Sequence, residues 1–125
     1  TFARCLQQGV EVRPLDTLVA GRWIDGRLDT WIGNPERNAL WQWLCDAKAV
    51  FDQVVVEGSL DEAGQSLAEY QLGVCEGSDW FWALPEANPG ESAASFQRLY
   101  RRHLGRLYQL LDEAPPPFDP GLMAG

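Results

Sequence analysis

The chain has 125 residues, of which 46% are hydrophobic, and its formal net charge is −8 at pH 7. This length suits one domain or part of one, and the apolar content indicates a globular protein with a substantial core. The acidic balance argues against nucleic acid and anionic membranes as partners, because phosphate groups are bound by concentrated Lys and Arg. No segment is apolar and long enough to cross a bilayer, and no signal peptide is visible.

The cysteine and histidine content limits which disulfides and metal sites the chain can form. Cys5, Cys45 and Cys75 are odd in number and far apart, which predicts buried free thiols and no disulfide framework. Free thiols are typical of a reducing compartment, so the sequence predicts a cytoplasmic protein. With one histidine, His103, and no CxxC or HxxxH pair, we expect no metal site and no cofactor.

The first 33 residues are predicted to hold little regular structure. Residues 2–8 fit the end of a helix, and residues 10–12 fit a short strand. Residues 16–33 then form an irregular, glycine-punctuated loop that carries Trp23 and Trp31. Long loops of this kind usually bind a ligand or are covered by a neighbouring domain.

A long amphipathic helix is predicted next, over about residues 35–56. Asn34 is a favourable N-cap, and proline suits the first helical position because its missing N–H costs nothing there. The apolar residues recur at steps of three and four and form one stripe. Its members are Leu40, Leu44, Ala47, Phe51 and Val54, widened by Trp41 and Cys45.

Two more helices complete the predicted bundle. One follows a Ser59–Glu62 capping box, with a stripe of Leu60, Ala63, Leu67, Tyr70 and Val74. The other covers about residues 92–112, with a buried side of Phe96, Leu99, Tyr100, His103, Leu107, Leu110 and Leu111. The sequence therefore predicts an all-α, three-helix up-down bundle over residues 34–113, between the segment 1–33 and a Pro-rich tail, 114–125.

The most informative segment for function is residues 74–82, where three large aromatic residues directly follow the acid Asp79. Flat rings cover the apolar face of a pyranose, and a carboxylate accepts hydrogen bonds from its hydroxyl groups. This pattern favours a sugar contact by Asp79 with Trp80 and Trp82. The alternative is structural: the aromatic residues belong to the core, and Asp79 caps a helix or pairs locally.

Three segments together, 20–38, 75–82 and 96–108, resemble one known family in order and wording. The similarity is to the C-terminal helical part of glycoside hydrolase family fifty-seven, the α-amylase and 4-α-glucanotransferase-like enzymes. The resemblance covers nearly the whole chain. Two positions depart from the pattern: Asn34 replaces a histidine of many relatives, and Ala83–Leu84 replaces a further aromatic residue followed by glycine.

The resemblance implies a specific role within a larger enzyme. In this family a distorted (β/α)7 barrel precedes the helical bundle, which closes one side of the active cleft. Catalysis retains the anomeric configuration and uses a Glu nucleophile and an Asp acid/base on the barrel. No catalytic residue is then expected in this chain. The resemblance assigns Asp79 to a sugar hydroxyl and Trp82 to stacking on the sugar. We expect Trp80 to contact the substrate as well, and Trp23 and Trp31 to border the cleft.

Two other functions fit the same residues. One is a non-catalytic carbohydrate-binding module, whose aromatic residues form a stacking platform. The other is a helical protein-interaction module, because interfaces favour Trp and Tyr. The expected partners are accordingly an α-glucan or oligosaccharide and an upstream barrel of the same polypeptide, with self-association if apolar surface is left uncovered.

Overall fold

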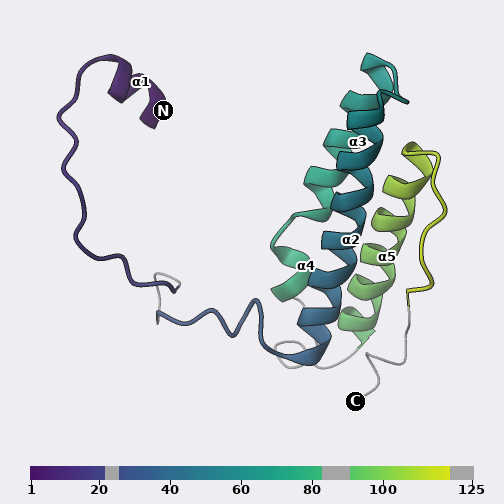
Figure 1. The fold of residues 1–125 in the computed structure, drawn as a ribbon. Helices are drawn as coiled ribbons and strands as arrows, with labels where there is room; N and C mark the ends of the chain where they lie inside the picture. The colour runs from purple at the N-terminus through teal and green to yellow at the C-terminus, as the bar shows by residue number, and fades with distance from the viewer. Residues whose placement is uncertain (22–25, 83–90, 119–125) are drawn as a thin grey trace.

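The computed structural model describes residues 1–21, 26–82 and 91–118. Within these ranges the chain forms five helices and no strand. Their bounds are Phe2–Gln7 (α1), Pro35–Glu57 (α2), Glu62–Cys75 (α3), Asp79–Trp82 (α4) and Glu91–Leu110 (α5). The long helices α2, α3 and α5 lie side by side and alternate in direction (Figure 1), which confirms the predicted all-α, up-down bundle.

Helix α2 begins and ends as its sequence predicts. The Asn34 side-chain oxygen accepts hydrogen bonds from the backbone N–H groups of Glu36, at 2.8 Å, and Arg37, at 3.4 Å. Gly58 ends the helix in the left-handed conformation, with φ of 68°, which glycine adopts at little cost. The five stripe residues expected on the core side are all buried, and Trp43 joins them.

Helix α3 corrects two expectations. Its N-cap is Asp61, whose carboxylate accepts a bond from the Gly64 N–H at 2.7 Å, and the Ser59–Glu62 capping box does not form. Its buried residues are Ala68, Leu72 and Cys75, whereas Leu67 is 57% and Tyr70 74% exposed. The predicted stripe is therefore wrong at Leu67 and Tyr70, whereas Leu60 and Val74 are half-buried. The small side chains of Ala68 and Cys75 lie in the core instead, where little room is left for larger groups.

Helix α5 buries a face that overlaps the predicted one only in part. Tyr100, Leu107 and Leu111 are buried as expected, together with Leu104 and Tyr108. Phe96 and Leu99, expected in the core, are exposed. His103 is half-buried between α5 and α3.

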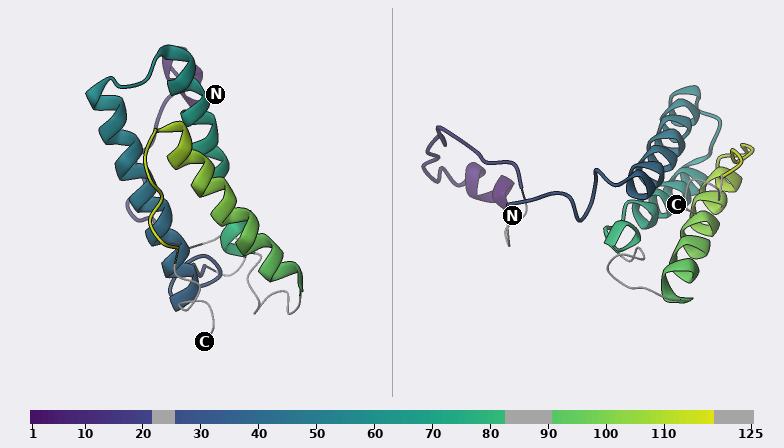
Figure 2. Two further views of the ribbon diagram at one scale, coloured as in Figure 1. Left: turned by 90° about the vertical axis from the view of Figure 1, so that its right-hand side faces the viewer. Right: turned by 90° about the horizontal axis from the view of Figure 1, so that it is seen from below.

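The tail after α5 is extended, as predicted, and it packs back onto the bundle. Its described part ends at Phe118, whose ring meets Trp43 edge-on at 5.3 Å between centroids and Tyr108 at 6.4 Å. The tail runs along the bundle between α2 and α5 (Figure 2, left). These two aromatic contacts fix its path and extend the core beyond the three helices.

The N-terminal segment forms an arm that stands apart from the bundle. Helix α1 has no buried residue, and every residue of 1–21 is exposed (Figures 1 and 2). The strand predicted at residues 10–12 does not form, because no second strand among the described residues offers a partner. No helix in the described part of the chain is both long and apolar enough to span a bilayer.

Candidate functional site

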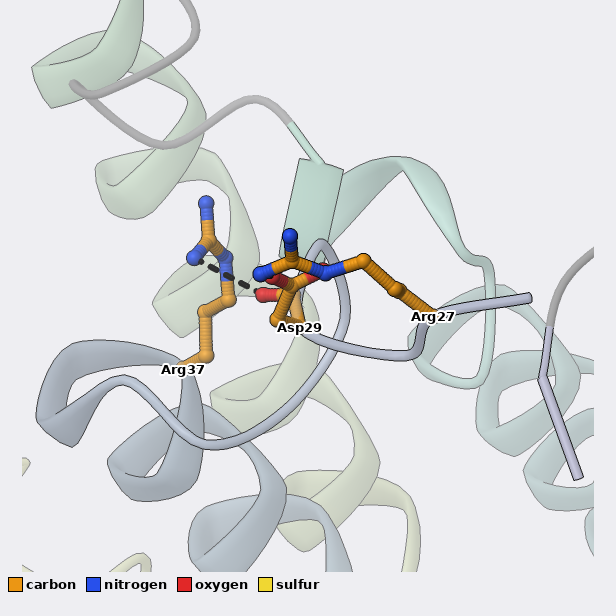
Figure 3. Close-up of polar contacts among 3 residues, drawn as sticks. All are labelled: Arg27, Asp29 and Arg37. Carbon is orange, nitrogen blue, oxygen red and sulfur yellow. Dashed lines mark hydrogen bonds and ion pairs between the residues drawn. The ribbon is translucent and has the colours of Figure 1, made fainter. Parts of the chain in front are cut away.

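Arg37 joins two parts of the chain that are far apart in sequence. It is the one charged residue that is buried in the described part of the chain. Its Nε donates to the carbonyl oxygen of Phe81 at 3.3 Å, and its Nη1 donates to that of Asp29 at 3.2 Å. Figure 3 shows Arg37 reaching the loop beside the ion pair of Arg27 and Asp29. The Trp-bearing loop is thereby fastened to α2 and to α4.

An aromatic stack continues this junction. The rings of Trp41 and Phe81 are stacked at 4.1 Å between centroids, and Phe81 is fully buried. The indole Nε1 of Trp41 donates to the Trp31 carbonyl at 2.8 Å. The loop, α2 and α4 therefore meet through both hydrogen bonds and ring contacts at one end of the bundle.

Trp80 packs against α5. Its Nε1 donates to the Val74 carbonyl at 2.7 Å, and its ring stacks on Tyr100 at 5.4 Å and leans on His103 at 5.3 Å. A Cβ atom on Gly77 would lie 3.3 Å from that nitrogen, so glycine makes room for the bond. These contacts show the packing role that was the structural alternative for Trp80, and its predicted sugar contact stays a prediction.

Asp79 is exposed, in contrast to the packed rings of Trp80 and Phe81 that follow it. Asp79 is the first residue of α4 and is exposed to solvent, whereas Phe81 in the same turn is buried. Trp31 is half-buried. Trp23 lies outside the described residues, as does the side chain of Trp82. The structure thus brings Asp79, Trp80 and Trp31 to one end of the bundle, through the contacts of Arg37, Trp41 and Phe81.

The sequence patterns did not assign Arg37 or Trp41 to the site, although they placed Trp41 beside the apolar stripe of α2. Arginine in the first turn of a helix faces the positive end of the helix dipole, which is unfavourable without a further contact. That position was the available signal for Arg37. No pattern in the sequence indicated that Trp41 would stack on Phe81.

An open groove of about 570 Å³ adjoins this end of the bundle, between α2 and the end of α3. Trp41 lines it together with Glu76, which belongs to the same motif as Asp79. Its other lining residues are Leu44, Cys45, Lys48, Ala49 and Asp52. Lys48 and Asp52 form an ion pair along α2. An aromatic ring and an ionisable carboxylate in one groove suit a hydroxylated ligand.

Burial raises the pKa of two groups near the middle of the core. The thiol of Cys75 has its pKa raised from 9.0 to about 11, mainly because burial disfavours the thiolate. Burial also raises the pKa of Tyr100, and the nearby thiols of Cys75 and Cys45 add to this. The Tyr100 hydroxyl has no hydrogen-bond partner among the described residues. Both groups are neutral at pH 7 and unsuited to act as nucleophile or base there.

The structure corrects the expectation that all three thiols are buried. Cys75 is a buried free thiol, but Cys5 and Cys45 are free and exposed. In the described part of the chain no three residues among His, Cys, Asp and Glu are grouped to hold a metal ion. Comparison of the chain with family models, curated proteins and solved structures finds no match.

Proposed function

We propose that this chain is the helical part of a retaining glycoside hydrolase that acts on α-glucans, of the kind that family fifty-seven represents. The observation that supports the proposal most is the junction at Arg37. The first segment of the resemblance contains Arg37 and Asp29, and the second contains Phe81, so one guanidinium bonds both segments. Tyr100, from the third segment, stacks on Trp80 of the second.

In this proposal Asp79 and Trp82 contact the substrate. Asp79 is exposed at the start of α4, where its carboxylate is free to accept hydrogen bonds from sugar hydroxyls. Trp82 stacks on a sugar ring, and Trp31 and Trp23 border the cleft. The catalytic Glu and Asp lie on an upstream barrel, and the chain alone is inactive.

Exposed apolar side chains on the arm support a covering domain. Phe2, Leu15, Leu18 and Val19 are large hydrophobic residues that the described structure leaves in solvent. Such surfaces are normally covered by another domain or chain. In the proposal the barrel covers the arm, and the free thiols of the chain fit a cytoplasmic enzyme.

The groove between α2 and α3 favours a second candidate, a non-catalytic carbohydrate-binding module. Trp41 and Glu76 line this groove and supply a ring and an acceptor without any catalytic pair. This candidate predicts that the 125-residue chain binds maltooligosaccharides, and that Glu76→Gln weakens the binding. A flat calorimetric titration at millimolar sugar would count against it.

The substitution Asp79→Asn in the full-length enzyme tests the main proposal. We expect a fall in kcat on the order of 100-fold, because the amide replaces a charged acceptor that serves the reacting sugar. The melting temperature should change little, since Asp79 is exposed. Asp46→Asn on the exposed side of α2 is the matched control. Unchanged kinetics in the Asp79 variant would contradict the assigned role.

A further inference from the structure

Helix α5 carries an unusual concentration of positive charge for this chain. Four of the ten Lys and Arg residues are on it, at Arg98, Arg101, Arg102 and Arg106, although the net charge of the chain is −8. Among the described residues none of the four forms an ion pair. Arg98 bonds the Ser95 hydroxyl, at 2.8 Å, and Arg106 bonds the Gln109 side chain, at 3.4 Å. The acidic residues that the structure describes therefore form no ion pair with these four side chains.

A groove of about 670 Å³ lies between α3 and α5 on the basic side of α5. Arg102 and Arg106 line it, together with Leu99 and Gln109. Gln71 of α3 closes the gap between the helices: its Nε2 donates to the His103 carbonyl at 3.0 Å and lies 3.1 Å from His103 Nδ1. This side-chain bridge keeps the two helices in register and gives the groove a polar floor.

Apolar side chains flank the groove on both helices. On α5, Leu99 is 42% and Phe96 39% exposed. On α3, Leu67 lies one helical turn before Gln71 on the same side, and it is exposed with its neighbour Tyr70. We call this surface the α3–α5 face. It combines uncovered apolar area with guanidinium groups, which is the composition of a protein-binding surface and not of a solvated helix side.

We propose that the α3–α5 face is a docking surface for an acidic amphipathic helix of another polypeptide. Apolar side chains of that helix would cover Leu99, Phe96 and Leu67. Its carboxylates would pair with the guanidinium groups, for which Arg offers bidentate geometry. Arg98, Arg102 and Arg106 recur every four residues, about 6 Å apart along α5. Carboxylates at the same spacing on a second helix match them one for one.

The proposal does not depend on the carbohydrate contact assigned to Asp79. The face lies on α3 and α5, and neither Asp79 nor the groove lined by Trp41 belongs to it. Loss of glucan contact by Asp79→Asn would therefore leave this surface unchanged.

Fluorescence anisotropy with a labelled synthetic helix tests the proposal. The probe carries leucine along one face and glutamate at positions four residues apart, and a second probe replaces each glutamate by lysine. We expect the full 125-residue chain to bind the acidic probe, and the affinity to fall at least tenfold when salt rises from about 50 to about 300 mM. The lysine probe should bind at least tenfold more weakly.

Variants locate the binding. The double variant Arg102→Glu with Arg106→Glu should lower the affinity for the acidic probe at least tenfold, as should Leu99→Asp. The control is Arg4→Glu with Arg13→Glu on the arm, which changes net charge equally and should shift the affinity less than about twofold. Far-ultraviolet circular dichroism checks that each variant keeps its helix content.

Three outcomes would overturn the proposal. One is the absence of specific binding: either the acidic probe does not bind at millimolar concentration, or the arm control loses as much affinity as Arg102→Glu with Arg106→Glu. A second is binding of phosphatidylserine vesicles in place of the acidic probe, which would make the face a membrane contact. The third is a dimer in sedimentation that Arg102→Glu with Arg106→Glu dissociates, which would make a second copy of the chain the occupant.

Discussion

The arm and the bundle contain similar apolar residues, but the bundle buries them and the arm exposes them. In the bundle, Leu40, Phe81 and Leu104 are buried almost completely, whereas Phe2 on the arm is 93% exposed. Gly9, Pro14, Gly21, Gly26 and Gly33 break the first 33 residues into pieces too short to carry an apolar stripe. The bundle helices repeat apolar residues over 14 to 23 residues and can pack against one another. Apolar content alone therefore does not decide burial, because the apolar residues must also lie on a helix long enough to pack against another.

Replacing one phenylalanine by alanine in each region should give the largest difference in the free energy of unfolding between bundle and arm. Phe81→Ala removes a fully buried ring that stacks on Trp41 and meets Tyr100 edge-on at 6.0 Å. We expect the free energy of unfolding to fall by about 3–5 kcal/mol, from lost burial and a cavity. Phe2→Ala on the arm should change it by less than about 0.5 kcal/mol. Urea denaturation followed by tryptophan fluorescence measures both, and equal changes would remove the distinction.

Arg37 bonds the loop that connects the arm to the bundle, so its removal should loosen the attachment of that loop. Arg37→Met keeps much of the side-chain length but deprives the carbonyls of Asp29 and Phe81 of a donor. We expect a loss of about 2 kcal/mol in the free energy of unfolding. Tryptic cleavage after Arg27 should become faster, because the loop loses one of its hydrogen bonds to α2 and keeps the one from Trp41 to Trp31. Arg13→Met on the arm is the control, and an Arg37 variant as stable and as resistant as the parent would contradict this assignment.

The buried thiol of Cys75 predicts that the stability of the fold depends on pH in the alkaline range. Burial raises the pKa of Cys75 from 9.0 to about 11, so the unfolded chain releases this proton at lower pH than the folded one. The stabilising contribution is complete below pH 9 and is lost as pH rises through 11. At pH 10 the loss should be about 1 kcal/mol relative to Cys75→Ala. Urea midpoints of both proteins at pH 7 and pH 10 measure it, and parallel changes would contradict the burial effect.

The smallest expected effect concerns a hydroxyl group in the core. Tyr100→Phe removes a buried hydroxyl that has no partner among the described residues. Because no hydrogen bond is lost there, we expect the free energy of unfolding to stay constant or rise by up to about 1 kcal/mol. Tyr70→Phe on the exposed side of α3 should change it by less than about 0.5 kcal/mol. A fall of more than about 1 kcal/mol in the Tyr100 variant would reveal a partner for the hydroxyl.

Helix positions could be predicted from the sequence because local chemistry sets them. Asn34, Pro35 and Gly58 mark the ends of α2 by capping and backbone preference alone, and the structure has the helix there. The buried face of α3 could not be predicted in the same way. Leu67 and Tyr70 have larger apolar surfaces than Ala68 but are exposed, because the packing of α3 against its neighbouring helices decides which side faces inward.

The residues of the candidate site could be predicted from the sequence, but their orientations and contacts could not. The run of residues 74–82 identified Asp79 and the aromatic residues around it. That Trp80 and Phe81 turn inward while Asp79 stays in solvent depends on contacts with Tyr100 and Trp41, residues that are 20 and 40 positions away from them. The role of Arg37 as a link between two segments depends equally on the tertiary fold.

The most direct test of the account is to read the coding sequence upstream of Thr1. The proposed function predicts a preceding region of several hundred residues, long enough for a (β/α)7 barrel, with a Glu and an Asp placed as the catalytic pair of a retaining glycosidase. An initiator methionine immediately before Thr1 would contradict it. The helical bundle would then be a free-standing protein, whose function would rest on binding alone.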